Sequence, residues 1–402
     1  MEKSSTRYLA LDGWRGIAAI GVAAFHFSVT NHFYPFSLIR NAGLYVDFFF
    51  VLSGFVIAHT YSRRVRTVHD AALYIVRRFG RLWPLHVFTL ACLVFLEAVK
   101  WIVVAEAGLS AGEEPFSAAN AAWAIPAHLA FLQSFGLFDD YTWNGPSWSI
   151  GAEFWTYIVF AGVCLAGQRS RTVWALGLAL LGFVVLPSGH HANLTATHDL
   201  GFFRCLLGFF TGVLTYRALT VWSLRPESGI SPTLMEGGIV GIAVLFLVTS
   251  KSPELDLYFR FLPIPIFSAM ILVFAKERGT ISRWLLTRPV QNLGRWSYSI
   301  YMIHFVLLTV MNSGLRVADE VFGTAFTIPD PRNSESLFRA PLFLGDAMFF
   351  VYLAIVIVCA SLTWRYVEEP WRVYFNNVAR RRKMSGASRP GPQSIPALPP
   401  SE

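Results

Sequence analysis

An arginine and a histidine in the first apolar segment have types and spacing that could do chemistry inside a membrane. Arg15 and His26 lie eleven residues apart, which is close to three turns of an α-helix, so both are expected on one face, about 16 Å apart along the axis. Ionisable side chains in an apolar span are costly and usually functional. A guanidinium binds phosphate, and an imidazole acts as a general base or a nucleophile. The small residues between them, Ala18, Ala19 and Val22, predict a narrow slot for an anionic ligand with a long arm.

Further ionisable residues are expected at a similar depth in other spans. Glu153 follows the helix-initiating run 144–147, and Asp47 and Arg204 lie near the outer starts of their own spans. A rise of about 1.5 Å per residue places His26 and Glu153 in the outer half of the bilayer. This layer predicts a polar cavity open to the outside. The alternative is a structural ion-paired network, for instance Asp47 with Arg204.

Three arginines lie close together between the second and third apolar segments. Arg77, Arg78 and Arg81 precede Trp83 and Pro84, and guanidinium groups pair with phosphate in a bidentate way. Alone, they would be read as a basic loop that binds lipid headgroups. Together with Arg15 at the membrane edge, they predict a phosphate clamp.

The composition predicts the elements that must position these residues. Hydrophobic residues make up 54% of the chain and charged residues 14%, with a mean hydropathy of +0.48, whereas soluble domains carry about 25% charged residues. We therefore predict an all-α, polytopic transmembrane helical bundle of about ten spans. The predicted spans are 12–31, 44–61, 82–105, 147–167, 172–187, 200–219, 235–250, 259–276, 294–312 and 342–366. Segment 121–138, which carries Pro126 and His128, is predicted to be re-entrant or interfacial.

The distribution of positive charge predicts the orientation. Most of the 33 lysines and arginines fall in the loops and tails on the side of the N-terminus, which places both termini in the cytoplasm. The first segment has no clear cleavage site for a signal peptidase, so we expect it to be retained. The net charge of +8 then reflects topology, and nucleic-acid binding is not predicted. We expect a multi-pass protein of the inner (plasma) membrane.

Two domains and no metal site are predicted. Residues 8–372 would form the transmembrane domain, and 373–402 a basic and then disordered cytoplasmic tail that is rich in Pro, Ser and Gly from Met384 onward. The four cysteines lack metal-ligand spacing and are read as small buried hydrophobic residues. His190, His191 and His198 are read as part of a solvated loop.

Six short motifs occur in an order that resembles the acyltransferase-3 family of integral-membrane O-acyltransferases. They are Arg15 with His26 in the context of 11–16, and then segments 46–55, 78–81, 148–153, 297–304 and 367–370. The resemblance covers roughly residues 8–372 and implies transfer of an acyl group, often acetyl, from cytoplasmic acyl-coenzyme A to a hydroxyl of a carbohydrate or another cell-envelope acceptor. Acyl-coenzyme A, with acetyl-coenzyme A as the expected form, would be the donor co-substrate.

The resemblance and the residue types together predict the roles in the site. Arg15, Arg78 and Arg81 would bind the donor's phosphates, His26 would act as general base or nucleophile, and Glu153 would orient His26. Further pocket candidates are Asp12, Asp47, Trp148, Ser149, Arg204, Tyr301 and His304. The expected partners are the donor, the acceptor and membrane lipids. The chain would either complete transfer alone or hand its acyl group to a separate extracytoplasmic partner, because it lacks the fused esterase-like domain of some members.

Several of these residues also have structural interpretations. Asp12 could cap the first helix beside its arginine, and Tyr301 with His304 could be a hydrogen-bonded core pair. Ser53 and Gly54 are expected to permit close helix packing.

Two other classes of function remain open at this point. A proton-coupled secondary transporter or exporter would also place His, Glu, Asp and Arg in the membrane, although no repeated halves are visible in the sequence. A lipid-binding scaffold would not need Arg15 and His26 to be aligned.

Overall fold

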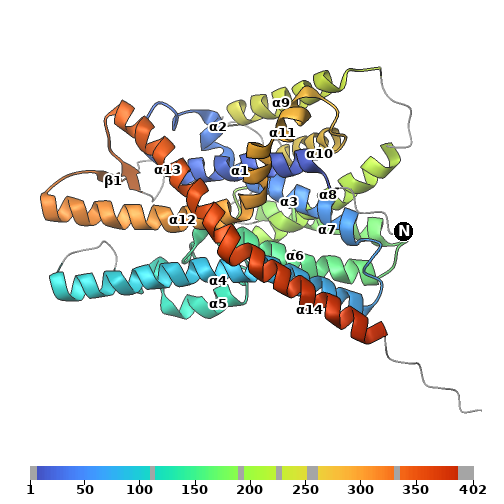
Figure 1. The fold of residues 1–402 in the computed structure, drawn as a ribbon, viewed down its shortest axis with the longest axis horizontal. Helices are drawn as coiled ribbons and strands as arrows, with labels where there is room; N and C mark the ends of the chain where they lie inside the picture. The colour runs from blue at the N-terminus through green and yellow to red at the C-terminus, as the bar shows by residue number, and fades with distance from the viewer. Residues whose placement is uncertain are drawn as a thin grey trace, which may run out of the picture.

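The chain folds into a bundle of long helices with one small hairpin (Figure 1). The computed structural model describes residues 7–108, 114–188, 194–222, 229–250, 261–329 and 336–387. The helices of the first half are α1 (Leu9–His26), α2 (Ser37–Arg40), α3 (Tyr45–Tyr61), α4 (Val68–Ala107), α5 (Ile125–Leu129), α6 (Trp148–Leu165) and α7 (Arg171–Val185). Those of the second half are α8 (Gly201–Trp222), α9 (Pro232–Thr249), α10 (Pro263–Phe274), α11 (Thr280–Leu285), α12 (Arg288–Phe322), α13 (Leu342–Thr363) and α14 (Glu369–Ala387).

Each of the ten predicted spans contains a helix, so the all-α polytopic fold is confirmed. Within the described residues, 8 helical segments are long and apolar enough to cross a membrane. The two remaining predicted spans correspond to α1 and α10. Helix α1 carries Asp12, Arg15 and His26 among its 18 residues, and α10 has only 12 residues. The predicted re-entrant segment 121–138 holds no long helix. It contains the 3-10 turn Ala122–Ala124 and the short α5, and a second 3-10 turn, Ala118–Asn120, precedes it.

Helix α4 begins much earlier than the sequence predicts. Thr67 and Asp70 form a capping box, in which each side chain binds the other residue's backbone N–H, and such a box is a strong helix start. The helix then runs for 40 residues through Pro84. The expectation of a loop between the second and third spans was therefore wrong. Arg78 and Arg81 lie on a helix, three residues apart and on one face.

Helices α1 and α12 cross at very short range. A methyl group on Gly16 would overlap the backbone of Gly294, and one on Gly294 would overlap the carbonyl of Asp12. Glycines at such a crossing let two backbones approach closely. This packing brings the polar face of α1 onto α12 and holds the two helices in a fixed register.

Small residues also join α3 to its neighbour. A methyl on Gly54 of α3 would overlap the carbonyl of Phe209 in α8, and one on Gly212 would overlap that of Val51. The predicted packing role of Gly54 is thus confirmed. The predicted burial of the cysteines holds for Cys164 and Cys205, while Cys92 and Cys359 are half-buried, and all four are free thiols.

The C-terminal part of the fold returns across the bundle. Strands β1 (Thr327–Pro329) and β2 (Ser336–Phe338) pair antiparallel after α12. Helix α13 then continues through a π-helical turn, Trp364–Glu368, into α14, which runs obliquely across the bundle in Figure 1. Phe375 of α14 packs on Gly80 of α4. Helix α14 thus crosses the predicted domain boundary at 372. The disordered tail was predicted from Met384 onward, but α14 continues to Ala387, and residues 388–402 lie outside the described residues.

Candidate active site

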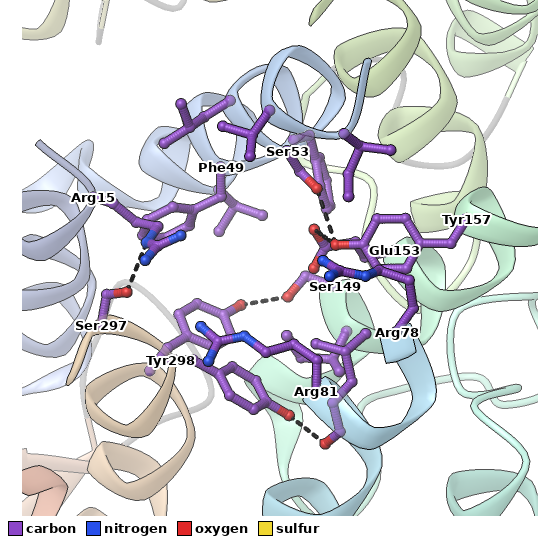
Figure 2. Close-up of a pocket in the computed structure, with 18 residues that line it drawn as sticks. Arg15, Phe49, Ser53, Arg78, Arg81, Ser149, Glu153, Tyr157, Ser297 and Tyr298 are labelled. Carbon is purple, nitrogen blue, oxygen red and sulfur yellow. Dashed lines mark hydrogen bonds between the residues drawn. The ribbon is translucent and has the colours of Figure 1, made fainter. Parts of the chain in front are cut away.

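A cavity of about 140 Å³ lies among α1, α3, α4, α6 and α12 (Figure 2). The wall from α3 is largely apolar and runs from Val46 to Ile57. The other walls are polar. The polar side chains that line the cavity are Arg15, Ser53, Arg78, Arg81, Ser149, Glu153, Tyr157, Ser297, Tyr298 and Tyr301.

Arg15 reaches the cavity from α1 and is held by α12. Its Nε donates to Ser297 Oγ at 2.9 Å, and one terminal nitrogen donates to the Gly294 carbonyl at 3.1 Å. Asp12 lies 3.3 Å from the same guanidinium. Since Ser297 and Gly294 belong to the close α1–α12 crossing, the packing of small residues there sets the direction of Arg15.

Asp12 does not cap α1 as the sequence suggested. The helix starts at Leu9, and no side chain of its own first turn caps it. The Ala10 N–H instead donates to Glu277 Oε1 at 2.8 Å. Asp12 lies within the first turn and pairs with Arg7 at 2.6 Å and with Arg15, so its carboxylate balances the charge of these two arginines.

Arg78 projects from α4 into an aromatic environment. It donates to Tyr61 Oη at 3.2 Å, and its guanidinium carbon lies 5.3 Å from the Tyr61 ring and 5.8 Å from the Tyr157 ring. Its Nε is buried and has no hydrogen-bond partner within the described parts of the chain. The direct contacts of Arg78 among the described residues are with neutral tyrosines, so no carboxylate there forms an ion pair with it.

Arg81 enters the same cavity with a different set of partners. It forms an ion pair with Glu368, whose side chain is fully buried, and its guanidinium carbon lies 5.6 Å from the Tyr298 ring. Glu368 also accepts from Ser299 Oγ at 2.7 Å. The π-helical turn that ends at Glu368 brings this carboxylate to α4, and π-helical turns of this kind often occur at functional sites.

Glu153 faces the cavity from α6, opposite Arg15 (Figure 2). The run 144–147 starts α6 through a 3-10 turn with Pro146 at its second position, as the sequence predicted. The hydroxyl of Tyr157 donates to Glu153 Oε1 at 2.6 Å. Nearby, Ser149 Oγ and Tyr301 Oη lie 2.7 Å apart, and each lies within hydrogen-bonding distance of the Pro146 carbonyl. Since each hydroxyl has one hydrogen, one of them donates to the other and the other donates to the carbonyl.

His26 lies beside the cavity and not among its lining residues. Its ring is 5.0 Å from that of His304, which in turn is 5.9 Å from the ring of Tyr301 on the cavity wall. His26 and Arg15 both contact α12, so the predicted shared face of α1 is confirmed. Among the described residues, the hydrogen-bond partners of the His26 ring are Val22 and His304, not Glu153. The predicted contact between Glu153 and His26 is not formed among the described residues.

The hydrogen bonds of the two histidines determine their neutral tautomers. A carbonyl only accepts, so His26 Nδ1, 2.9 Å from the Val22 carbonyl, carries a hydrogen. His304 Nδ1, 3.3 Å from the Ile300 carbonyl, carries one for the same reason. His304 Nε2 then carries a lone pair and lies 3.3 Å from His26 Nδ1, so the one hydrogen on Nδ1 is shared between His304 and the Val22 carbonyl. The lone pair of His26 therefore resides on Nε2, where a base or nucleophile would act.

Residues 8–365 match the acyltransferase-3 family, which is described as an acyltransferase domain. This match covers most of the chain. The chain belongs to the acyltransferase-3 family. It therefore carries the acyltransferase domain of this family, as its motifs predicted.

Relatives of this acyltransferase carry related names. It is 23% identical over 409 residues to the putative peptidoglycan O-acetyltransferase YrhL of Bacillus subtilis, covering 93% of this chain and 57% of that protein. It is 23% identical to the peptidoglycan O-acetyltransferase OatA of Listeria monocytogenes, with 92% of this chain and 57% of that protein covered. The acyltransferase MdmB of Streptomyces mycarofaciens is 22% identical, with 98% of both chains covered.

The chain thus spans little more than half the length of the two peptidoglycan enzymes and nearly the full length of MdmB. No solved structure matches this acyltransferase.

Two predicted pocket residues belong instead to a buried ion pair. Arg204 of α8 donates to both oxygens of Asp47, at 2.9 and 2.8 Å, and to the Ala196 carbonyl at 3.0 Å. Trp148 covers the guanidinium at 5.2 Å. None of Asp47, Arg204 and Trp148 lines the cavity. The alternative reading of this pair as a structural network fits its geometry.

The small residues of α1 do not form the predicted slot. Ala18, Ala19 and Val22 are all buried, and none of them lines the cavity beside Arg15. Ala18 lines a separate, largely apolar cavity of about 60 Å³ between α1 and the helices α9 and α10. Where α1 meets α12, the close approach at Gly16 and Gly294 leaves no slot that connects Arg15 with His26. The cavity opens instead between α12 and the helices α3, α4 and α6.

Sequence reasoning missed the aromatic residues around the charged groups. Tyr61, Tyr157 and Tyr298 contact Arg78, Glu153 or Arg81, and none of them was singled out from the sequence. Tyr157 could have been found, because it follows Glu153 by four residues and so lies on the same helix face. Tyr61 could not, since its contact with Arg78 depends on the packing of α3 against α4.

Proposed function

We propose that this acyltransferase moves an acyl group, and specifically an acetyl group, from cytoplasmic acyl-coenzyme A to a hydroxyl of a carbohydrate in the cell envelope. The observation that carries the proposal is the convergence of Arg15, Arg78 and Arg81 with Glu153 on one cavity. The names of the relatives, two of which are peptidoglycan O-acetyltransferases, support a carbohydrate acceptor. The enzyme would act in the inner (plasma) membrane.

The arginines fit a ligand that carries several phosphates. Three guanidinium groups from two helices face one cavity, and guanidinium pairs with phosphate in a bidentate way. Arg78 has an unused buried donor, Nε, that a phosphate oxygen would accept. The inner ends of α1 and α4 supply these arginines, so we place the donor on the cytoplasmic side, where the positive-inside rule also puts the basic helix α14.

The apolar wall from α3 suits the arm and the acyl end of the donor. This arm would extend along the cavity towards Tyr301, past which lies His304 and then His26. The acyl group would thus reach His26 near the end of the cavity that faces the acceptor. The volume of about 140 Å³ favours a short acyl group.

His26 would take the proton of the acceptor hydroxyl on Nε2, the atom with the lone pair. The hydroxyl oxygen attacks the thioester carbonyl, the new C–O bond forms, and the C–S bond breaks. Coenzyme A leaves as a thiolate and takes up the proton from the imidazolium. Alternatively, Nε2 attacks the carbonyl first and gives an acyl-imidazole that the acceptor then cleaves. Glu153 lines the cavity without contacting His26 in the described structure, so its negative charge would stabilise the imidazolium across the cavity and not through a direct hydrogen bond.

Oriented proteoliposomes test the proposal. Coenzyme A release should require acyl-coenzyme A on the face that carries Lys383, an exposed residue near the end of α14. His26→Ala should lower turnover by about a hundredfold or more, which is the usual contribution of a general base, while His69→Ala, at an exposed position of α4, should leave it unchanged. An acyl group trapped on the protein after a donor pulse would identify the acyl-imidazole route. Near-normal turnover in His26→Ala would remove His26 from the mechanism.

The acceptor is identified in the same preparation. Cell-wall glycan, lipid-linked sugar and soluble sugar are offered in turn on the opposite face, and mass spectrometry detects the acyl ester. Transfer only in the presence of an extracytoplasmic extract would indicate a separate partner that completes the reaction. An ion gradient should have no effect on turnover.

A further inference from the structure

Tyr157 connects the two proposed halves of the site. It lies one helical turn after Glu153 on α6, and its side chain is 4% exposed. Its hydroxyl is 2.6 Å from Glu153 Oε1. A carboxylate oxygen accepts, so the tyrosine is the donor, and this short charge-assisted bond is stronger than a neutral one.

A second hydrogen bond reaches Tyr157 from across the cavity. Ser53 Oγ of α3 lies 3.0 Å from Tyr157 Oη. Because the single hydroxyl hydrogen of Tyr157 is already given to Glu153, Ser53 must be the donor in this pair. The bonds therefore run in one direction, from Ser53 to Tyr157 to Glu153 (Figure 2), and bonds in such a chain strengthen one another.

The ring of Tyr157 has a different neighbour from its hydroxyl. The Arg78 guanidinium lies 5.8 Å from the ring centre, and a second ring, that of Tyr61, lies 5.3 Å from it on α3. Contacts between a guanidinium and an aromatic face are favourable at this range. One side chain thus touches both the proposed phosphate-binding Arg78 and the proposed catalytic carboxylate.

We propose that Tyr157 is a positioning residue with two separable actions, an inference that rests on the proposed function. Its hydroxyl fixes one oxygen of Glu153, which leaves Oε2 turned to the cavity. Its ring fixes the plane of Arg78, so that the donor's phosphates and the carboxylate are held at a constant separation. The hydroxyl serves the chemical step, and the ring serves donor binding.

Two substitutions separate these actions. Tyr157→Phe keeps the ring and loses the hydroxyl, so kcat should fall by about tenfold or more, the value of a hydrogen bond to a charged group, while KM for acyl-coenzyme A stays within about twofold. Tyr157→Leu loses both, so kcat should fall as far and KM for the donor should also rise. Ser53→Ala should lower kcat by a smaller factor.

Tyr74→Phe is the matched control. Tyr74 is equally buried and its ring lies 6.2 Å from that of Tyr157, yet its hydroxyl has no hydrogen-bond partner among the residues described. Removing that hydroxyl should change neither kcat nor KM. An equal loss in both Tyr→Phe variants would mean that the core is merely sensitive to substitution, and would overturn the inference.

A double variant tests the coupling of Tyr157 with Glu153 in a way that a loss of folded protein would not reproduce. If Tyr157 acts through Glu153, Tyr157→Phe should cause no further loss of kcat in a Glu153→Gln background, since coupled residues are not additive. Additive losses of kcat, or an unchanged kcat in Tyr157→Phe, would overturn the inference about Tyr157 but not the proposed function, because the parent enzyme would still turn over. A parent enzyme that binds no acyl-coenzyme A in a direct titration would instead overturn the proposed function, and the inference with it.

Discussion

Two sets of arginines within the helical bundle have opposite surroundings. Arg204 gives three hydrogen bonds, two of them to the fully buried carboxylate of Asp47, and its face is covered by Trp148. Arg15 and Arg78 line a cavity, and the direct partners of Arg78 are neutral. The sequence places arginines of both sets in or beside apolar spans. The difference indicates how to interpret an arginine inside the membrane. An arginine whose N–H donors are all bonded to buried groups stabilises the fold, whereas one with an N–H donor left unbonded beside a cavity is a candidate for ligand binding.

Arg81 belongs to both sets. It lines the cavity, but it is also paired with Glu368, whose side chain has 0% exposure. A phosphate that binds Arg81 must therefore share it with a buried carboxylate. This mixed position makes Arg81 a weaker test of donor binding than Arg78, unless Glu368 is changed with it.

The largest effect is expected from breaking the Asp47–Arg204 pair. Asp47→Asn leaves a buried guanidinium without its counter-charge, which should cost about 3–5 kcal/mol of folding free energy. Thermal unfolding in detergent and the yield of folded protein measure it. Asp47→Leu with Arg204→Met should recover most of the stability, because apolar residues of similar volume often replace a buried pair without loss. Full stability of Asp47→Asn alone would contradict a structural role for the pair.

A smaller effect on a different quantity is expected at Arg78. Arg78→Ala should leave the unfolding temperature nearly unchanged and weaken acyl-coenzyme A binding by about 1.5–3 kcal/mol, or about ten- to a hundredfold. Titration of donor and acceptor separately shows whether the loss is confined to the donor. Arg81→Ala should lower both stability and donor affinity, and Glu368→Gln in the same chain should restore only the stability. Unchanged donor affinity in Arg78→Ala would mean that Arg78 does not bind the donor and contributes only to the positive charge of the cytoplasmic side.

The smallest effect is expected when the charge is kept and the shape is lost. Arg78→Lys retains a cation but loses the planar group between the rings of Tyr61 and Tyr157, so donor binding should weaken by about 0.5–2 kcal/mol. Raising the salt concentration should weaken donor binding in the parent and the lysine variant and less in Arg78→Ala. A lysine variant as impaired as alanine would show that geometry, and not charge, dominates at this position.

The sequence by itself determined the class of the protein and most of its helices. Apolar runs of about 20 residues can satisfy their backbone in a bilayer only as helices, and all ten predicted segments contain one. The eleven-residue spacing placed Arg15 and His26 on one face of α1, because helix periodicity depends only on local geometry. The motif order led to the acyltransferase-3 family, which the match over 8–365 bears out.

Only the tertiary structure decided which of these residues meet. Depth arithmetic placed His26, Glu153, Asp47 and Arg204 in one layer, but depth carries no information on how each helix is rotated or which helix stands beside it. The crossing at Gly16 and Gly294 closed the slot expected on α1 and set His304, not Glu153, beside His26. The meeting of α4 with the end of α3 and with α6 then gave Arg78 its neighbours Tyr61 and Tyr157. The contact of His26 with His304 joins residues 278 positions apart, and no local pattern in the chain encodes it.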